Sequence, residues 1–98
     1  MENDAIFHEE ASAEYEAAFE WYYLRSEFAA ERFVEEIDRA ISQILASPRR
    51  WPETTHQIRK FRLQRFPFAV FYRQTASGIQ ILAVAHGRRR PGYWKRRV

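Results

Sequence analysis

Hydrophobic residues recur at helical spacing in the first half of the chain. The first stretch has apolar positions separated by four, three and four residues, with one more beside them: Ala11, Tyr15, Ala18, Tyr22 and Phe19. The second repeats the pattern more cleanly, with Phe33, Ile37, Ala40, Ile41, Ile44 and Leu45. Ser26 is suited to cap the second helix, and Ser47-Pro48 to end it. Two amphipathic helices joined by so short a turn predict an antiparallel hairpin.

After Pro48 the period of the pattern becomes two. Residues 49–57 predict a loop, and residues 58–65 alternate, with Phe61 and Leu63 on the inner face. Apolar runs at 68–72 and 79–85, separated by a turn at 76–78, predict two more strands, and residues 4–8 predict a short first strand. Short connections make the last three strands antiparallel neighbours. The prediction is a single α+β domain over residues 1–98, a helical hairpin packed on a small antiparallel sheet in the order β-α-α-β-β-β.

Composition narrows the class of protein. Hydrophobic residues make up 46% and charged residues 30%, as in soluble globular domains. No apolar run approaches the roughly 20 residues of a membrane span. The first residues do not resemble a signal peptide, and the absence of cysteine fits a reducing compartment, so a cytoplasmic protein that does not engage membranes is expected.

Metal and cofactor chemistry are not expected. His8, His56 and His86 are far apart in sequence and show no ligand spacing, so no metal site is predicted. Gly78, Gly87 and Gly92 are isolated and form no phosphate loop, so no cofactor is predicted.

The charge is divided between the two halves. Residues 1–47 contain twelve acids and three arginines, a net charge of −9, whereas residues 48–98 contain thirteen bases and Glu53 alone, a net charge of +12. One interpretation is that the halves neutralise each other where they pack. The other is that the basic half binds a polyanionic or acidic partner. The clusters at 88–90 and 95–97 are too dense to be neutralised locally.

Two sets of residues are candidates for function. The segment 85–94 leaves the end of an apolar strand and combines His86 with arginines and Tyr93, which suits acid–base chemistry on a phosphodiester. Alternatively, Tyr93 and Trp94 dock the tail on the core. Bases in the strands would form a cationic sheet face or remain solvated. The predicted partner-binding residues are Arg59, Arg62, Arg65, Arg73, Arg88, Arg89, Arg90, Tyr93 and Trp94, with Lys60 in the same basic set.

The chain resembles the RelE/ParE family of toxins from toxin–antitoxin systems. The resemblance extends over nearly the whole sequence and is carried by loose motifs in a fixed order: Phe7-His8, Ala11 and Glu14, Trp21-Tyr22, Phe33, Ile37, Ala40-Ile41, Pro48, Ile58-Arg59, Arg65-Phe66-Pro67-Phe68, Phe71-Tyr72, residues 81–86 and residues 89–94. The family fold, two helices on a small antiparallel sheet, agrees with the fold expected from periodicity.

The resemblance implies one of two activities. RelE-like members cleave messenger RNA on the ribosome, and ParE-like members bind DNA gyrase and stall it with broken DNA. Nucleases of the family usually carry a basic residue where this chain has Ala69. The absence of that basic residue would remove on the order of 3 kcal/mol of transition-state stabilisation. Arg65 or Arg73 is a possible substitute. A nuclease would use His86, Arg65, Arg89 and Tyr93.

The sequence therefore favours a ParE-like toxin that acts on gyrase by protein–protein binding rather than as an enzyme. A ribosome-dependent nuclease acting on messenger RNA and an inactive member that only binds its antitoxin are the alternatives. In each case a cognate antitoxin is the expected partner, with hydrophobic anchors in an apolar groove beside the hairpin and an acidic segment on the basic half.

Overall fold

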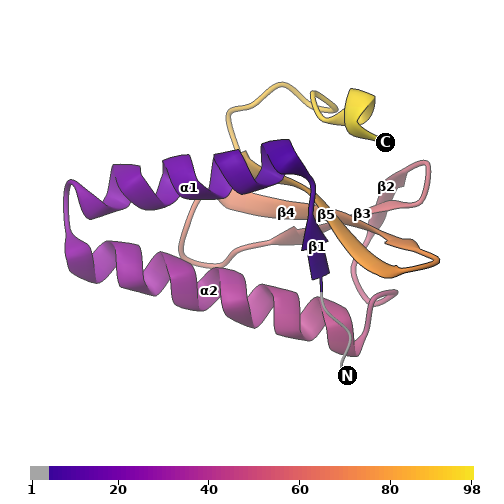
Figure 1. Ribbon diagram of the computed structural model, residues 1–98, viewed down its shortest axis with the longest axis horizontal. Coiled ribbons are helices and arrows are strands. Elements are labelled where there is room, and N and C mark those ends of the chain that lie inside the picture. The colour runs from indigo at the N-terminus through magenta and orange to yellow at the C-terminus, as the bar shows by residue number, and fades with distance from the viewer. Residues whose placement is uncertain (1–4) are drawn as a thin grey trace.

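Two antiparallel helices lie on a five-stranded sheet in the computed structural model, which describes residues 5–98 (Figure 1). The helices are α1 (Glu9–Tyr23) and α2 (Glu27–Ala46). The strands are β1 (Ala5–Phe7), β2 (Glu53–Thr55), β3 (Ile58–Arg62), β4 (Phe68–Thr75) and β5 (Gly78–His86). A 3-10 turn, η1 (Lys95–Arg97), lies near the C-terminus.

The helical hairpin is confirmed, and local capping explains its ends. Ser26 has extended backbone angles, and its side chain accepts a hydrogen bond from the Ala29 amide at the start of α2. His8 caps α1 in a similar way, because Nδ1 of its side chain accepts a hydrogen bond from the Glu10 amide. The predicted face of α2 is buried, with Phe33, Ile37 and Ile44 almost inaccessible. Capping and burial thus fix both the length and the rotation of α2.

The sheet is mixed, which corrects the expectation of a wholly antiparallel one. Its order is β1-β5-β4-β3-β2. The predicted antiparallel pairing of β3, β4 and β5 is confirmed, but β1 pairs parallel to β5. The connection from β1 to β5 passes through both helices, and such a long crossover permits parallel pairing. The first strand is confirmed at Ala5–Phe7, and residue 4 lies outside the described residues.

The predicted loop at 49–57 is wrong in part, because Glu53–Thr55 forms β2 and pairs antiparallel to β3. A two-residue turn, His56-Gln57, joins these strands. Threonines at 54 and 55 are typical of strands, but the single proline at 52 favoured a loop interpretation. Pairing with a neighbouring strand overrode that local signal.

Each face of the sheet has its own hydrophobic core. The helices cover the first face, where Phe33 and Ile37 of α2 meet Val70, Tyr72 and Ile81. Phe61 and Leu63 belong to this core, as predicted. On the second face the C-terminal segment supplies Trp94, which packs on Ile58, Leu82 and Ala83 with its ring 4.9 Å from that of Phe71. The sheet is therefore a middle layer between the helices and the tail.

The β2–β3 turn places two ordinary residues in the left-handed region of backbone space. His56 has φ of 52° and Gln57 has φ of 67°. Positive φ at both central positions is the conformation of the tightest hairpin turns, where Asn-Gly is the usual pair. A side chain in this conformation strains the backbone because Cβ approaches the following carbonyl.

Gln57→Gly should therefore raise the free energy of unfolding by about 1 kcal/mol, since glycine adopts this conformation without strain. Denaturant titration measures the change. The matched control is Gln74→Gly, in β4, where φ is not positive, and this substitution should destabilise the protein. Destabilisation of similar size by both substitutions would contradict the assignment of strain to the turn.

Candidate functional site

A single carboxylate on α1 fixes the C-terminal segment, residues 87–98, to the rest of the molecule. Oε2 of Glu14 accepts hydrogen bonds from the Tyr93 hydroxyl at 2.7 Å and from Nη2 of Arg97 at 2.8 Å. Oε1 accepts from Nη1 of Arg97 at 3.1 Å. The Arg97 side chain is only 3% exposed, so this is a buried, bidentate ion pair. We call Glu14, Tyr93 and Arg97 the Glu14 clamp.

The clamp also completes the edge of β5 where β1 ends. The pairing of β1 stops at Ile81, and the register with β4 shifts so that Leu82 has no partner in β4. Nη1 of Arg97 donates to the Leu82 carbonyl at 2.8 Å, and the Val84 amide donates to Oε1 of Glu14 at 2.9 Å. Two charged side chains thus take the place of the missing strand, which satisfies backbone groups that burial would otherwise leave unpaired.

The electrostatics of the clamp follow from burial and hydrogen bonding. Burial by itself raises the pKa of Glu14, but hydrogen bonds from Arg97, Tyr93 and the Val84 amide, with the charge of Arg97, outweigh it, and the pKa lies below its ordinary value. Burial, followed by donation to Glu14, raises the pKa of Tyr93. The hydrogen bond to Glu14 raises the pKa of Arg97. Glu14 is therefore held as the anion, and Tyr93 keeps its proton.

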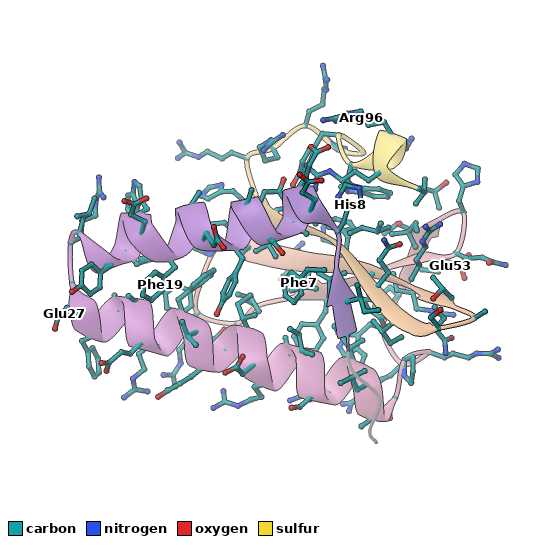
Figure 2. The ribbon with its side chains drawn as sticks, in the orientation of Figure 1. Phe7, His8, Phe19, Glu27, Glu53 and Arg96 are labelled. Atoms are coloured by element: carbon teal, nitrogen blue, oxygen red, sulfur yellow. The ribbon has the colours of Figure 1, made fainter. Side chains whose placement is uncertain are left out.

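Part of the charge division is internal neutralisation, as one interpretation of the sequence proposed. Arg96, which Figure 2 shows on the C-terminal segment, lies 2.8 Å from Glu10. Arg97 lies within 3.3 Å of the same carboxylate. Arg89 also lies 3.9 Å from Glu14, and within the second half itself Arg59 pairs with Glu53 at 3.6 Å. Among residues 5–98, the remaining nine bases of the second half have no carboxylate within 4 Å. Most of the cationic surface is therefore available.

The tail residues predicted to bind a partner separate into two kinds. Trp94 is buried at 3% exposure, and Tyr93 is half-buried in the clamp, so both dock the tail, in agreement with the structural interpretation of the segment. Arg88, Arg89 and Arg90 are exposed, and the guanidinium of Arg89 stacks 3.7 Å from the centre of the Tyr93 ring. Of these five residues, only the three arginines present charge to a partner.

The strand bases do not form one cationic face. Arg59 pairs in register with Tyr72 on the helix side of the sheet, and it donates to the carbonyls of Arg49 and Trp51. Because side chains alternate along a strand, Lys60 and Arg62 lie on the opposite face. Arg73 donates to Gln80 at 2.8 Å. The period-two pattern thus divides the bases between two faces, so the single cationic sheet face expected from the sequence does not form.

Three of the four residues named for a nuclease, His86, Arg89 and Tyr93, line one hollow together with Ala69, and only Arg65 lies elsewhere. Arg65 lines a hollow with Arg32, Glu35 and Arg39 of the α2 side, apart from the residues around His86 and Tyr93. Nδ1 of His86 accepts from the Arg88 amide, and its ring stands edge-on to Phe68 at 5.1 Å. Ala69 is buried opposite Ala85 in the paired strands.

An apolar groove of about 420 Å³ runs between α1 and the end of β5. We define it by Ala17, Ala18, Trp21 and Tyr22 of α1, Pro67, Phe68, Val84 and His86 of the sheet side, and Glu14 and Arg89 at its polar end. Trp21 is 53% exposed, and Arg25 stacks on its ring at 3.7 Å. This is the groove beside the hairpin that the sequence predicted.

Sequence reasoning missed the two residues on which the site depends most. Glu14 entered only as part of a family motif, and Arg97 was one base in a basic cluster. Nothing in their spacing, 83 residues apart, connects them. The sequence did hold one signal: Glu14 lies three residues after Ala11 and so falls in line with the apolar residues that α1 buries.

Comparisons with known proteins give the family of the chain and a solved structure of the same fold. A family model described as "ParE toxin of type II toxin-antitoxin system, parDE" matches residues 5–91. A solved structure titled "Chromosomal ParDE TA system from P. aeruginosa" has the same fold, with a TM-score of 0.73 at 20% sequence identity, covering 86% of this chain and 95% of the other. No curated protein matches the sequence.

The family match defines a toxin of a type II toxin–antitoxin system. The chain belongs to the ParE toxin family. Within residues 5–98, no helix combines the length and apolar character that crossing a bilayer requires.

Glu14→Ala should lower the free energy of unfolding at neutral pH by about 3 kcal/mol, because it leaves Arg97 buried without its partner. Glu16→Ala, on an exposed position of the same helix, should change it by less than about 0.5 kcal/mol. Denaturant titration measures both. Equal effects of the two substitutions would exclude a special role for Glu14.

The stabilisation that Glu14 provides should also depend on pH. Because the pKa of Glu14 is lower in the folded protein, its stabilisation is complete above its unfolded value, near 4.5, and is lost as the pH falls through the folded value. The difference between the native protein and Glu14→Ala should therefore shrink as the pH is lowered from about 5 to 3. A constant difference over that range would contradict the role of the ionised carboxylate.

Proposed function

We propose that this protein is a cytoplasmic ParE-like toxin that inhibits DNA gyrase by protein–protein binding and is neutralised by a cognate antitoxin. The observation that carries the proposal is the match of residues 5–91 to the ParE toxin family. The exposed arginines at 88–90 are the surface proposed to contact the target, since they are held on a fixed tail and Arg88 and Arg90 have no carboxylate nearby among residues 5–98.

The side chains near the tail support binding rather than RNA cleavage. A general acid or base must exchange a proton with the substrate. Tyr93 donates its proton to Glu14 at 2.7 Å, and its pKa is raised, so the tyrosine is poorly placed to give or take one. Ala69 supplies no charge for a phosphodiester transition state. Arg65 lies with α2, away from His86.

The apolar groove supports an antitoxin that docks beside α1. Its lining is mainly apolar and aromatic, and Trp21 is an exposed anchor of the kind that dominates interface energies. Arg89 and His86 at one end suit an acidic residue of the antitoxin.

Purified toxin should inhibit supercoiling by gyrase and accumulate cleaved plasmid DNA. Gel electrophoresis of plasmid incubated with gyrase, with and without the toxin, measures both effects. Toxin saturated with its antitoxin is the control and should leave supercoiling unchanged.

A toxin that neither inhibits gyrase nor traps cleaved DNA would overturn the proposal. Cleavage of messenger RNA in a translation extract, lost on His86→Ala or Tyr93→Phe, would replace it with the nuclease activity. Absence of all these effects, with antitoxin binding retained, would identify an inactive member of the family.

Trp21→Ala should weaken antitoxin binding about 30-fold, which corresponds to about 2 kcal/mol for an aromatic anchor. Phe28→Ala is the matched control, because Phe28 is 64% exposed on α2 but does not line the groove, and it should change the dissociation constant less than threefold. Calorimetric titration of toxin with antitoxin measures both. Equal loss in the two variants would argue against the groove as the docking site.

A further inference from the structure

A second hollow, of about 370 Å³, lies on the opposite side of the sheet from the helices. Lys60, Ala69, Phe71 and Ala85 of the strands contribute to it. The C-terminal segment contributes Arg89, Arg90 and Lys95, and β2 contributes Thr54 and Thr55. We call it the cationic hollow, because its lining holds four lysines and arginines and no carboxylate. Its only titratable groups of another type are His86 and Tyr93.

The positive charge of the hollow is largely uncompensated. Lys60, Arg90 and Lys95 have no carboxylate within 4 Å among residues 5–98, and the nearest to Arg89 is Glu14 at 3.9 Å. Cations gathered in a concave surface with low-dielectric walls reinforce one another's potential and attract anions. The hollow is therefore a favourable site for a polyanion.

The tail cations are positioned by a rigid support. The Glu14 clamp and the buried Trp94 hold the segment at its C-terminal end. Successive backbone hydrogen bonds, from the Arg89 amide to His86 and from the Tyr93 amide to Arg90, fold the part between into turns. Cations held in place before binding lose less conformational entropy when a ligand arrives.

Gly92 makes room for one of these cations. Its φ is +76°, and a Cβ there would lie 2.8 Å from Cε of Lys95 and 3.3 Å from its ammonium nitrogen. The lysine side chain therefore lies directly against the glycine backbone at the wall of the hollow. A side chain at position 92 would both strain the backbone and displace the ammonium group.

We infer that the cationic hollow binds the phosphodiester backbone of DNA and does not read its bases. The aromatic rings that reach it are already covered: Arg89 stacks on Tyr93, and Phe71 packs against Trp94 with the Lys60 ammonium 5.7 Å from its centre. Of the rings in the lining, this leaves only the His86 imidazole for base stacking, whereas guanidinium, ammonium and hydroxyl groups are the usual ligands of nucleic-acid phosphates.

An acidic peptide fits the hollow less well. β4, which contributes Ala69 and Phe71 to the hollow, is paired on both sides, with β3 and with β5, so a peptide backbone finds no open edge along this strand. A phosphodiester chain needs only the charged and hydroxyl groups that the hollow presents. The choice of DNA over RNA rests on the proposed function, because a gyrase inhibitor acts where duplex DNA is held and cut.

Fluorescence anisotropy with a labelled 20-base-pair duplex tests the inference with the toxin alone. Neutralising about four phosphates should give a slope of about −3.6 for the logarithm of the binding constant against that of salt concentration. Lys60→Gln/Arg90→Gln/Lys95→Gln should weaken binding at least tenfold and reduce the slope by about three. Gly92→Ala should weaken binding several-fold.

The matched control removes the same charge elsewhere. Arg25→Gln/Arg32→Gln/Arg39→Gln changes three arginines of the helical hairpin, none of which lines the hollow, and should alter affinity less than threefold. Equal loss in both triple variants, or no binding at low salt, would overturn the inference. Far-ultraviolet circular dichroism and denaturant titration show that each variant is folded.

Two competitors distinguish the ligand classes. Polyglutamate that displaces the duplex at equal charge concentration would overturn the inference in favour of an acidic peptide. Single-stranded RNA that binds more than tenfold tighter than the duplex would overturn the assignment to DNA. The assay contains no gyrase, so a toxin that fails to bind the duplex can still inhibit gyrase. Conversely, a toxin that fails to inhibit gyrase can still bind DNA, and this assay alone decides that point.

Discussion

The carboxylate of Glu14 is the constraint on which the arrangement of this protein depends. This carboxylate, on α1, accepts hydrogen bonds from the Val84 amide of β5. It also accepts hydrogen bonds from Tyr93 and Arg97 of the C-terminal segment. Charge-assisted hydrogen bonds of this kind are strong where water is excluded. Removing one partner is costly because it leaves the other charge buried in a low-dielectric environment without compensation. One side chain thereby joins the helix layer, the sheet and the C-terminal segment.

The position of the clamp decides which surfaces remain open. It closes the β5 edge at Leu82 and Val84, just where the parallel pairing with β1 stops. Beyond it lies the apolar groove on the helix side, and on the other face the tail and the sheet enclose the cationic hollow. Arg89 contributes to both. An apolar anchor and a polyanion would therefore bind on different faces of the molecule, with the fixed tail between them.

The periodicity of apolar residues correctly predicted those elements that bury one face against the core. The apolar stripe of α2, the Ser26 cap and the alternation that places Phe61 and Leu63 inward are confirmed, because burial of one face dictates such patterns directly. The parallel pairing of β1 and the existence of β2 were missed. Both depend on which strand lies alongside, and a three-residue strand carries too few residues to display a period.

The sequence by itself determined the helical hairpin, the three central antiparallel strands, the division of charge and the resemblance to the toxin family that the family match confirms. Only the tertiary structure decided that Arg97 is buried while Arg90 is exposed, although both belong to the same basic half. The reason is physical: a local pattern records which face of an element is apolar. The partner of a buried charge can lie 83 residues away, and only folding brings the two together.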